Sequence, residues 1–335
     1  MGNDYKPIDL SRIRTYSLSE RKSKVSEALF AKTYQAGSSF QDFIDTLPDI
    51  LAGSDLRQVV SCLATAFLKK KIRVWAMGAH VIKVGLNPVV VDLMERGVVS
   101  ALALNGAGII HDLEIAMTGS TSEDVAEALD SGDFGMARET CEFLGEAIQT
   151  AGNHSMGLGE AVGRAIIAKR LPRREHSILA AGARLGIPVT VHVAIGTDIL
   201  HMHPGFDPEK AGGATHRDFR IFASIISRLQ GGVYLNIGSA VILPEIFLKA
   251  VSIARNLGHE LENFTTVNMD FIRQYRPLTN VVHRPTARGG KGINLVGHHE
   301  ILLPLIAAGV IERIGKDSNL RDRLPADSQD KGKKT

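Results

Sequence analysis

This sequence of 335 residues has little cysteine, little aromatic content and no long apolar run. Its two cysteines, Cys62 and Cys141, lie far apart, which excludes a cysteine zinc cage and is typical of a reducing cytoplasm. The first 25 residues mix lysine and arginine with polar residues, so we expect no secretory signal. The longest uncharged segment, residues 229–244, is short and broken by glycine, and we therefore expect no membrane span.

The sequence also lacks a large excess of charge of either sign. Its formal net charge is +3, which gives no reason to expect a nucleic-acid partner. Hydrophobic residues make up 44% and charged residues 22%, ordinary fractions that exclude disordered and collagen-like chains. We therefore expect a soluble, globular, cytoplasmic protein.

The fold class follows from five short runs of apolar and β-branched residues that end in glycine, aspartate or asparagine. Because most of these runs lack apolar/polar alternation, we interpret them as strands buried on both faces. The predicted strands are Ile72–Gly78, Leu102–Gly108, Val189–Gly196, Gly231–Gly238 and Thr265–Asp270. Helical patterns separate them, at Asn87–Arg96, Phe134–Ala151, Thr215–Leu229 and Ser239–Leu257. This alternation predicts an α/β fold, Rossmann-like and doubly wound, with a mostly parallel sheet and helices on both faces.

The sequence divides into an arm, one domain and a tail. Residues 1–50 are more polar and are predicted to form a helical arm that packs on the sheet or on a neighbouring subunit. Residues 51–314 contain no linker and are predicted to form one domain. Residues 315–335 are polar and are predicted to be a disordered tail. Two capping boxes are expected, Ser120 with Glu123 and Thr215 with Asp218.

Small and polar residues collect where the predicted strands end. In an open parallel sheet, ligands bind outside the carboxyl ends of the strands, where glycine lets the backbone approach a phosphate. The residues at these ends are Gly78-Ala79, Asn105-Gly106, Gly196-Thr197-Asp198 and Gly238-Ser239. Asp198 is of the type that accepts ribose hydroxyls, and Ser239 is placed to cap a helix and bind a ligand. Together these residues predict a nucleotide site.

One segment, Phe271–His299, carries five arginines or lysines and no carboxylate. Its prolines and glycines predict a loop, for which two interpretations stay open: a solvated basic loop, or an active-site loop facing an anion. Lys291 is flanked by glycines and surrounded by cations, conditions that favour the neutral amine a nucleophile needs.

A separate pattern, His201-Met202-His203, raises the alternative of a zinc site completed by other histidines. Neighbouring candidates are His192, His216, His298 and His299, but the sequence lacks an HExxH motif. A histidine-ligated metal hydrolase is therefore one alternative, although we assign no metal ligands.

The segment Gly78–Asp112 resembles, without gaps, the nicotinamide-binding region of the deoxyhypusine synthase family. The resemblance continues through residues 196–198, 237–241 and 266–268, and then through Arg284-Pro285, Gly290-Lys291 and Leu303-Pro304-Leu305. It covers most of residues 60–310. The order of the motifs gives it specificity, since each motif alone is short.

The resemblance implies a Rossmann-like homotetramer that binds NAD near subunit interfaces. In that family NAD takes a hydride from a polyamine, the imine passes to an active-site lysine, and then to an acceptor amine. The matching lysine here is Lys291. The matching cofactor residues are Gly78, Ala79, Asn105, Gly106, Asp198, Gly238, Ser239 and Asn268.

The amine side departs from the family pattern. His111 and His203 stand where the pattern has acids, Pro244 replaces a histidine, and the acidic loop before the lysine has become basic. We therefore expect a changed substrate, a small-molecule amine or a protein lysine as acceptor, contacted by residues that include His111, His203, Arg284, Arg288 and His298. The second hypothesis is a non-catalytic or regulatory NAD-binding protein.

Overall fold

The computed structural model describes residues 5–316. Its centre is a six-stranded sheet in the order β3-β2-β1-β4-β5-β6, in which every neighbouring pair is parallel. The strands are β1 (Arg73–Met77), β2 (Ala101–Asn105), β3 (Val189–His192), β4 (Val233–Ile237), β5 (Thr265–Asp270) and β6 (Lys291–Val296). All five predicted strands are present, and the predicted α/β class is confirmed; β6 is a sixth strand, formed by residues that were predicted to lie in a loop.

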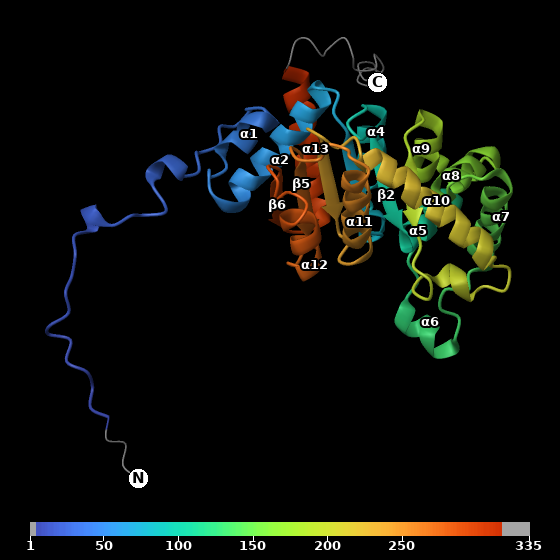
Figure 1. Ribbon diagram of the computed structural model, residues 1–335, viewed down its shortest axis with the longest axis horizontal. Helices are drawn as coiled ribbons and strands as arrows, with labels where there is room; N and C mark the ends of the chain where they lie inside the picture. Colours follow the sequence, from blue (N-terminus) through green and yellow to red (C-terminus); the bar gives the residue numbers. More distant parts are fainter. Residues whose placement is uncertain (1–4, 317–335) are drawn as a thin grey trace.

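Helices precede, connect and follow these strands (Figure 1). The α-helices are α1 (Phe40–Thr46), α2 (Leu51–Leu68), α3 (His80–Lys83), α4 (Asn87–Glu95), α5 (Gly106–Thr118), α6 (Val125–Ser131), α7 (Arg138–His154), α8 (Leu158–Ala168), α9 (Ile178–Leu185), α10 (Pro208–Ile226), α11 (Ile242–Asn256), α12 (Tyr275–Pro277) and α13 (His299–Lys316). Shorter turns are η1 (Leu18–Glu20), η2 (Glu27–Leu29), η3 (Arg174–His176), η4 (Ile199–Met202) and the π-helix η5 (Leu278–His283). No helix in residues 5–316 combines the length and apolarity needed to cross a membrane.

The sheet is covered on both faces. On one face α2, α4 and α13 pack against inward-facing side chains that include Trp75 and Leu102. On the other face α10 and α11 pack against Tyr234, whose ring stacks on Phe247 of α11 at 3.7 Å between centroids. Because the strands bury apolar side chains on both faces, they read as continuous apolar runs in the sequence.

The N-terminal arm differs from its prediction. Residues 5–37 are almost entirely exposed and contain only the short turns η1 and η2, so the one α-helix of the predicted arm is α1. In Figure 1 this segment leads away from the body of the molecule. Of the predicted tail, Gly315 and Lys316 end α13, and residues 317–335 lie outside the described residues.

Both predicted capping boxes are wrong. The N-cap of α6 is Asp124, and Glu123 instead accepts a hydrogen bond from the Gly135 N–H at 2.9 Å. Helix α10 begins seven residues before Thr215, so Thr215 and Asp218 lie inside it. Asp218 is buried and accepts hydrogen bonds from backbone N–H groups of α8 and β3.

Candidate functional site at the carboxyl ends of the strands

The strand order reverses direction between β1 and β4. Strands β2 and β3 lie on one side of β1, and strands β4, β5 and β6 lie on its other side. In open parallel sheets, ligands bind in the crevice outside the carboxyl ends of the strands at such a reversal, which here is the position that follows β1 and β4. The structure places the predicted residues Gly78-Ala79 and Gly238-Ser239 there, directly after β1 and β4.

Two glycines bring the backbones of this crevice into direct contact. The Gly78 N–H donates to the Ile237 carbonyl at 2.8 Å, and a Cβ on Gly78 would lie 2.2 Å from the Gly238 carbonyl oxygen. Gly238 has a φ of +65°, and a Cβ there would lie 2.8 Å from Cε1 of His299. The backbones at the ends of β1 and β4 are thus packed directly against each other, and both positions require glycine.

A third glycine joins the ends of β2 and β3. Asn105 is the N-cap of α5, and its side-chain oxygen accepts from the Gly108 N–H at 3.0 Å. A Cβ on Gly106 would lie 2.1 Å from Oδ2 of Asp198, so the carboxylate rests on the glycine. Oδ2 also accepts from the Ala194 N–H at 2.8 Å, and burial raises the pKa of Asp198. Asn105, Gly106 and Asp198 therefore come together as predicted.

Beside this glycine lies a cavity of about 520 Å³, a volume within the usual range for small-molecule sites. It lies between α5 and the loops that follow α5 and β3. Apolar side chains such as Ile110 and Phe134 form part of its wall. The ionisable residues that line it are Lys83, His111, Glu114, Glu123 and Asp198. Carboxylates outnumber lysine, which suits a ligand with a cationic group.

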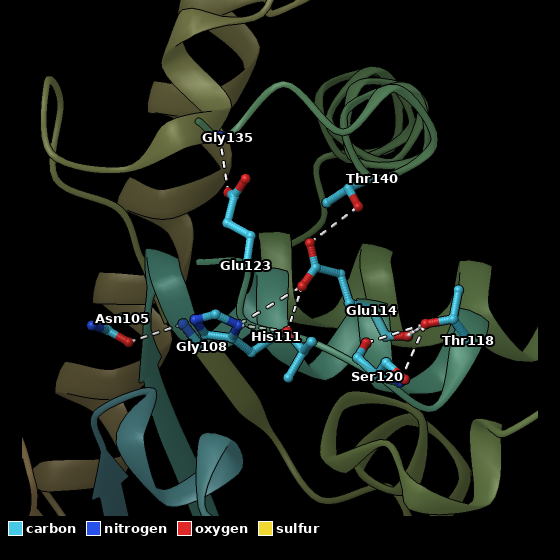
Figure 2. Close-up of polar contacts among 10 residues, drawn as sticks. Asn105, Gly108, His111, Glu114, Thr118, Ser120, Glu123, Gly135 and Thr140 are labelled. Atoms are coloured by element: carbon cyan, nitrogen blue, oxygen red, sulfur yellow. Dashed lines mark hydrogen bonds and ion pairs between the residues drawn. The ribbon is translucent and has the colours of Figure 1, made fainter. Parts of the chain in front are cut away.

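His111 belongs to a hydrogen-bonded cluster on one wall of this cavity (Figure 2). His111 and Glu114 are one turn apart on α5, and the Thr121 hydroxyl bridges them: Nδ1 of His111 lies 2.6 Å from Thr121 Oγ1, which donates to Glu114 Oε2. Thr140 donates to the other Glu114 oxygen at 3.3 Å. Burial acts to raise the pKa of Glu114, but bonds from His111 and Thr121 hold it below its usual value. Glu114 is therefore an ionised acceptor.

Two predicted cofactor residues have side chains already engaged within the fold. The N-cap of α11 is Val241 and not Ser239, although the Ser239 hydroxyl accepts from the Leu243 N–H at 3.2 Å in the first turn of this helix. Asn268 is fully buried, and both ends of its amide are bonded to Asn236 and Asn294 at 2.8 Å each, in a row of three asparagines across β4, β5 and β6. The Asn268 side chain is therefore engaged within the sheet, and the cofactor role expected for this residue stays a prediction.

Lys291 lies away from these residues, and it begins a strand where a loop was predicted. It is the first residue of β6 and pairs with Thr265, the first residue of β5. The carboxyl end of β5 is five residues further on. Lys291 therefore lies at the amino ends of the strands, about 16 Å from their carboxyl ends. Burial raises the pKa of Asp55 in α2, and the ammonium group of Lys291 opposes that shift.

The other residues expected on the substrate side do not line the cavity. Arg284 donates to Asn280 at 2.9 Å at the end of η5, and Arg288 is exposed in the following turn. His298 is exposed beside Glu300, and His203 Nδ1 accepts from the Gly205 N–H at 3.3 Å. Of the predicted substrate residues, the structure places only His111 in the cavity.

The sequence predictions did not include Glu114 or Thr121, and they considered His299 only as a metal candidate. His299 is buried between Gly238 and His80, its Nε2 lies 3.2 Å from the Met269 carbonyl, and its Nδ1 has no partner in the described residues. Burial lowers its pKa, so it is neutral at pH 7. His111 and Glu114 are three residues apart, a spacing that brings side chains together on a helix, but no helix was predicted over these residues. No sequence signal indicated Thr121, because it contacts this helix only through the conformation of the loop after α5.

The histidine metal hypothesis receives no support. Within residues 5–316 no group of three histidine, cysteine, aspartate or glutamate side chains is arranged to hold a metal ion. Nδ1 of His201 lies 2.8 Å from the Asp198 carbonyl, and His203 is engaged with Gly205 as described above.

No protein-family profile matches this sequence, and no curated protein is significantly similar to it in sequence. Among solved structures, unliganded AgrE has 14% sequence identity and a TM-score of 0.51, covering 83% of this chain and 34% of the AgrE chain. AgrE in a ternary complex with ornithine and NAD+ has 16% identity and a TM-score of 0.48, covering 77% and 32%. A proposed deoxyhypusine synthase from Entamoeba histolytica has 13% identity and a TM-score of 0.49, covering 84% and 96%.

These similarities are distant. This chain spans about a third of the AgrE chains. The match to unliganded AgrE is one of fold, an α/β arrangement built on a parallel sheet.

Proposed function

We propose that this protein is an enzyme that uses a nicotinamide dinucleotide, NAD, to oxidise a small-molecule amine. The observation that carries this proposal is the crevice at the strand-order reversal, where Gly78 and Gly238 leave no room for a side chain. In doubly wound sheets this position binds dinucleotides. AgrE, which shares the fold, has been solved with NAD+ and ornithine bound.

The residues around the crevice fit such a cofactor. The N-terminus of α11 follows Gly238, and there the Ile242 N–H has no partner within the helix and would be available to the pyrophosphate. The Leu243 N–H, in contrast, is bonded to Ser239, and Pro244 has no N–H. Asp198, above Gly106, is an acceptor of the kind that binds ribose hydroxyls. When bound, a nicotinamide ring supplies a hydride acceptor.

The substrate would occupy the neighbouring cavity. Its carboxylates, Glu114, Glu123 and Asp198, favour a cationic ligand, and Ile110 and Phe134 provide apolar surface for a carbon chain. These features support an amine substrate that carries a short hydrocarbon segment.

The finer reaction, transfer of an aminobutyl-type group through an imine on Lys291 to an acceptor amine, needs a further element. Because Lys291 lies at the amino ends of the strands, it would have to reach the cavity of another subunit, as in the homotetramer expected from the resemblance. The acceptor would then be a small amine or a protein lysine. Borohydride trapping with 1,4-diaminobutane, spermidine and NAD+, followed by peptide mapping, tests this step: labelled Lys291 supports it, and unlabelled Lys291 refutes it.

Cofactor binding is tested first, by calorimetric titration of the full chain with NAD+ and with NADH at millimolar concentration. Heat of binding to either supports the proposal, and its absence for both refutes it. Catalysis is then tested by NADH fluorescence with spermidine, 1,4-diaminobutane and agmatine, each with and without a second amine.

The non-catalytic alternative draws on one specific observation, the distance of Lys291 from the crevice. It predicts NAD binding without turnover of any amine and without labelling of Lys291. The titration and the amine screen together separate the two functions.

A further inference from the structure

The cavity contains a histidine whose ring is oriented by two other side chains. His111 and Glu114 face the cavity from α5, with side chains 17% and 21% exposed, and Thr121 joins them from the loop that follows the helix. Figure 2 shows the three elements that meet here: α5, the loop after it, and α7, which contributes Thr140.

The hydrogen bonds determine which ring nitrogen carries the proton. A hydroxyl has one hydrogen, and that of Thr121 is given to Glu114, because an ionised carboxylate only accepts. Towards His111, Thr121 Oγ1 can then act only as an acceptor. Nδ1 of His111, at 2.6 Å, must therefore be the donor.

The other ring nitrogen, Nε2, is consequently unprotonated in the neutral ring. It is neither buried nor hydrogen-bonded within the described part of the chain, and the residue that carries it lines the cavity. A carboxylate, a hydroxyl and an imidazole in series hold a proton acceptor in one tautomer, as a base and its orienting group do in hydrolases.

We propose that His111 is the catalytic base of the amine oxidation, with Thr121 and Glu114 as positioning residues. The inference rests on the proposed function. His111 Nε2 takes a proton from the substrate's nitrogen, and the electron pair left there forms the new C=N bond. The hydrogen of the adjacent C–H bond leaves with its electron pair to an oxidised nicotinamide, so the amine is oxidised and NAD+ is reduced.

The tautomer assigned to His111 is tested by a measurement that needs no catalytic activity. In the full chain labelled with 15N-histidine, we expect the His111 spectrum of the neutral Nδ1–H tautomer, assigned by its loss in His111→Gln. Thr121→Val removes the acceptor and should shift the signal towards the Nε2–H tautomer, whereas Thr121→Ser should preserve it. An Nε2–H tautomer in the unmodified protein, or a spectrum unchanged by Thr121→Val, would overturn the assignment.

The catalytic part is tested with the amine that gives the strongest NADH signal among spermidine, 1,4-diaminobutane and agmatine. His111→Ala should lower kcat by about 100- to 10,000-fold, with partial rescue by added imidazole. Thr121→Val should lower kcat by about 10- to 100-fold with little change in KM, and Thr121→Ser should restore it. The matched control is His259→Ala, an exposed histidine outside the cavity, which should leave kcat unchanged.

The two proposals fail differently. Absence of NAD binding, or of NADH formation with all three amines, refutes the proposed function, and the tautomer experiment still decides the state of His111. NAD binding and amine oxidation that persist in His111→Ala refute the catalytic role of His111 alone.

Discussion

Gly106→Ala is the substitution that most directly tests the dinucleotide site. Gly106 has no positive φ, so alanine fits the backbone at the start of α5. The added Cβ, however, would lie 2.1 Å from Oδ2 and 2.2 Å from Cγ of Asp198. The carboxylate must therefore move by at least about 1.3 Å to reach ordinary contact. This movement takes Oδ2 away from the N–H of Ala194.

The size of the effect follows from the interaction that is lost. A hydrogen bond to a charged group contributes about 1.5–3 kcal/mol, so a ribose held by Asp198 would bind about 10- to 150-fold more weakly. Stability should fall less, by about 1–2 kcal/mol, because alanine offsets part of the loss through its higher helix propensity.

The assay is calorimetric titration with NAD+, accompanied by urea unfolding. The matched control is Gly212→Ala in α10, where a Cβ meets nothing within 4 Å. This variant should bind NAD+ as the unmodified protein does and gain about 0.5–1 kcal/mol of stability. A dissociation constant of Gly106→Ala within twofold of the unmodified value would refute the placement of the ribose at Asp198.

Three further predictions concern the scaffold of the site, each measured by urea unfolding. Gly78→Ala places a Cβ 2.2 Å from the Gly238 carbonyl, which cannot rotate away as a side chain can, and should cost about 3 kcal/mol or more; a cost below 1 kcal/mol would contradict this. Asp112→Ala leaves the buried N–H groups of Ile178 and Leu179 unpaired and should cost about 2–5 kcal/mol, so a neutral result would contradict their dependence on Asp112. Burial raises the pKa of Asp218 to about 7. The folded state therefore holds its proton more tightly, and the contribution of this group to stability, present below pH 4, is lost as pH rises to 7. The loss is on the order of 4 kcal/mol, and Asp218→Asn should flatten this part of the pH dependence.

The strands and their ends were predictable from the sequence because each strand is a short buried run followed by a small or polar residue. Gly78, Gly106 and Gly238 occupy the ends of β1, β2 and β4 as expected. The sixth strand was not predictable in this way. Strand β6 is an edge strand whose residues are half exposed, and its sequence, KGINLV, begins with lysine and glycine in a basic segment.

That missed strand determines where Lys291 lies. Because residues 291–296 pair with β5 in parallel, Lys291 is fixed at the end of the sheet where the strands begin. The basic segment before it folds into α12 and η5, where Arg276 lies 3.6 Å from a Glu245 carboxylate oxygen. This segment has no carboxylate of its own, but its Arg276 lies close to one on α11. A count of charges along the sequence does not reveal such a contact.

The α/β class, the parallel strands and the glycines at their ends could be read from the sequence alone, because these depend on local hydrophobic pattern and on backbone space. Which of these residues contact one another depends on the folded chain. Asp198 reaches Gly106 from 92 positions away in the chain, and Thr121 folds back between His111 and Glu114. Such contacts depend on how loops close over the sheet, and loop closure is governed by packing and hydrogen bonds between distant segments that no local pattern records.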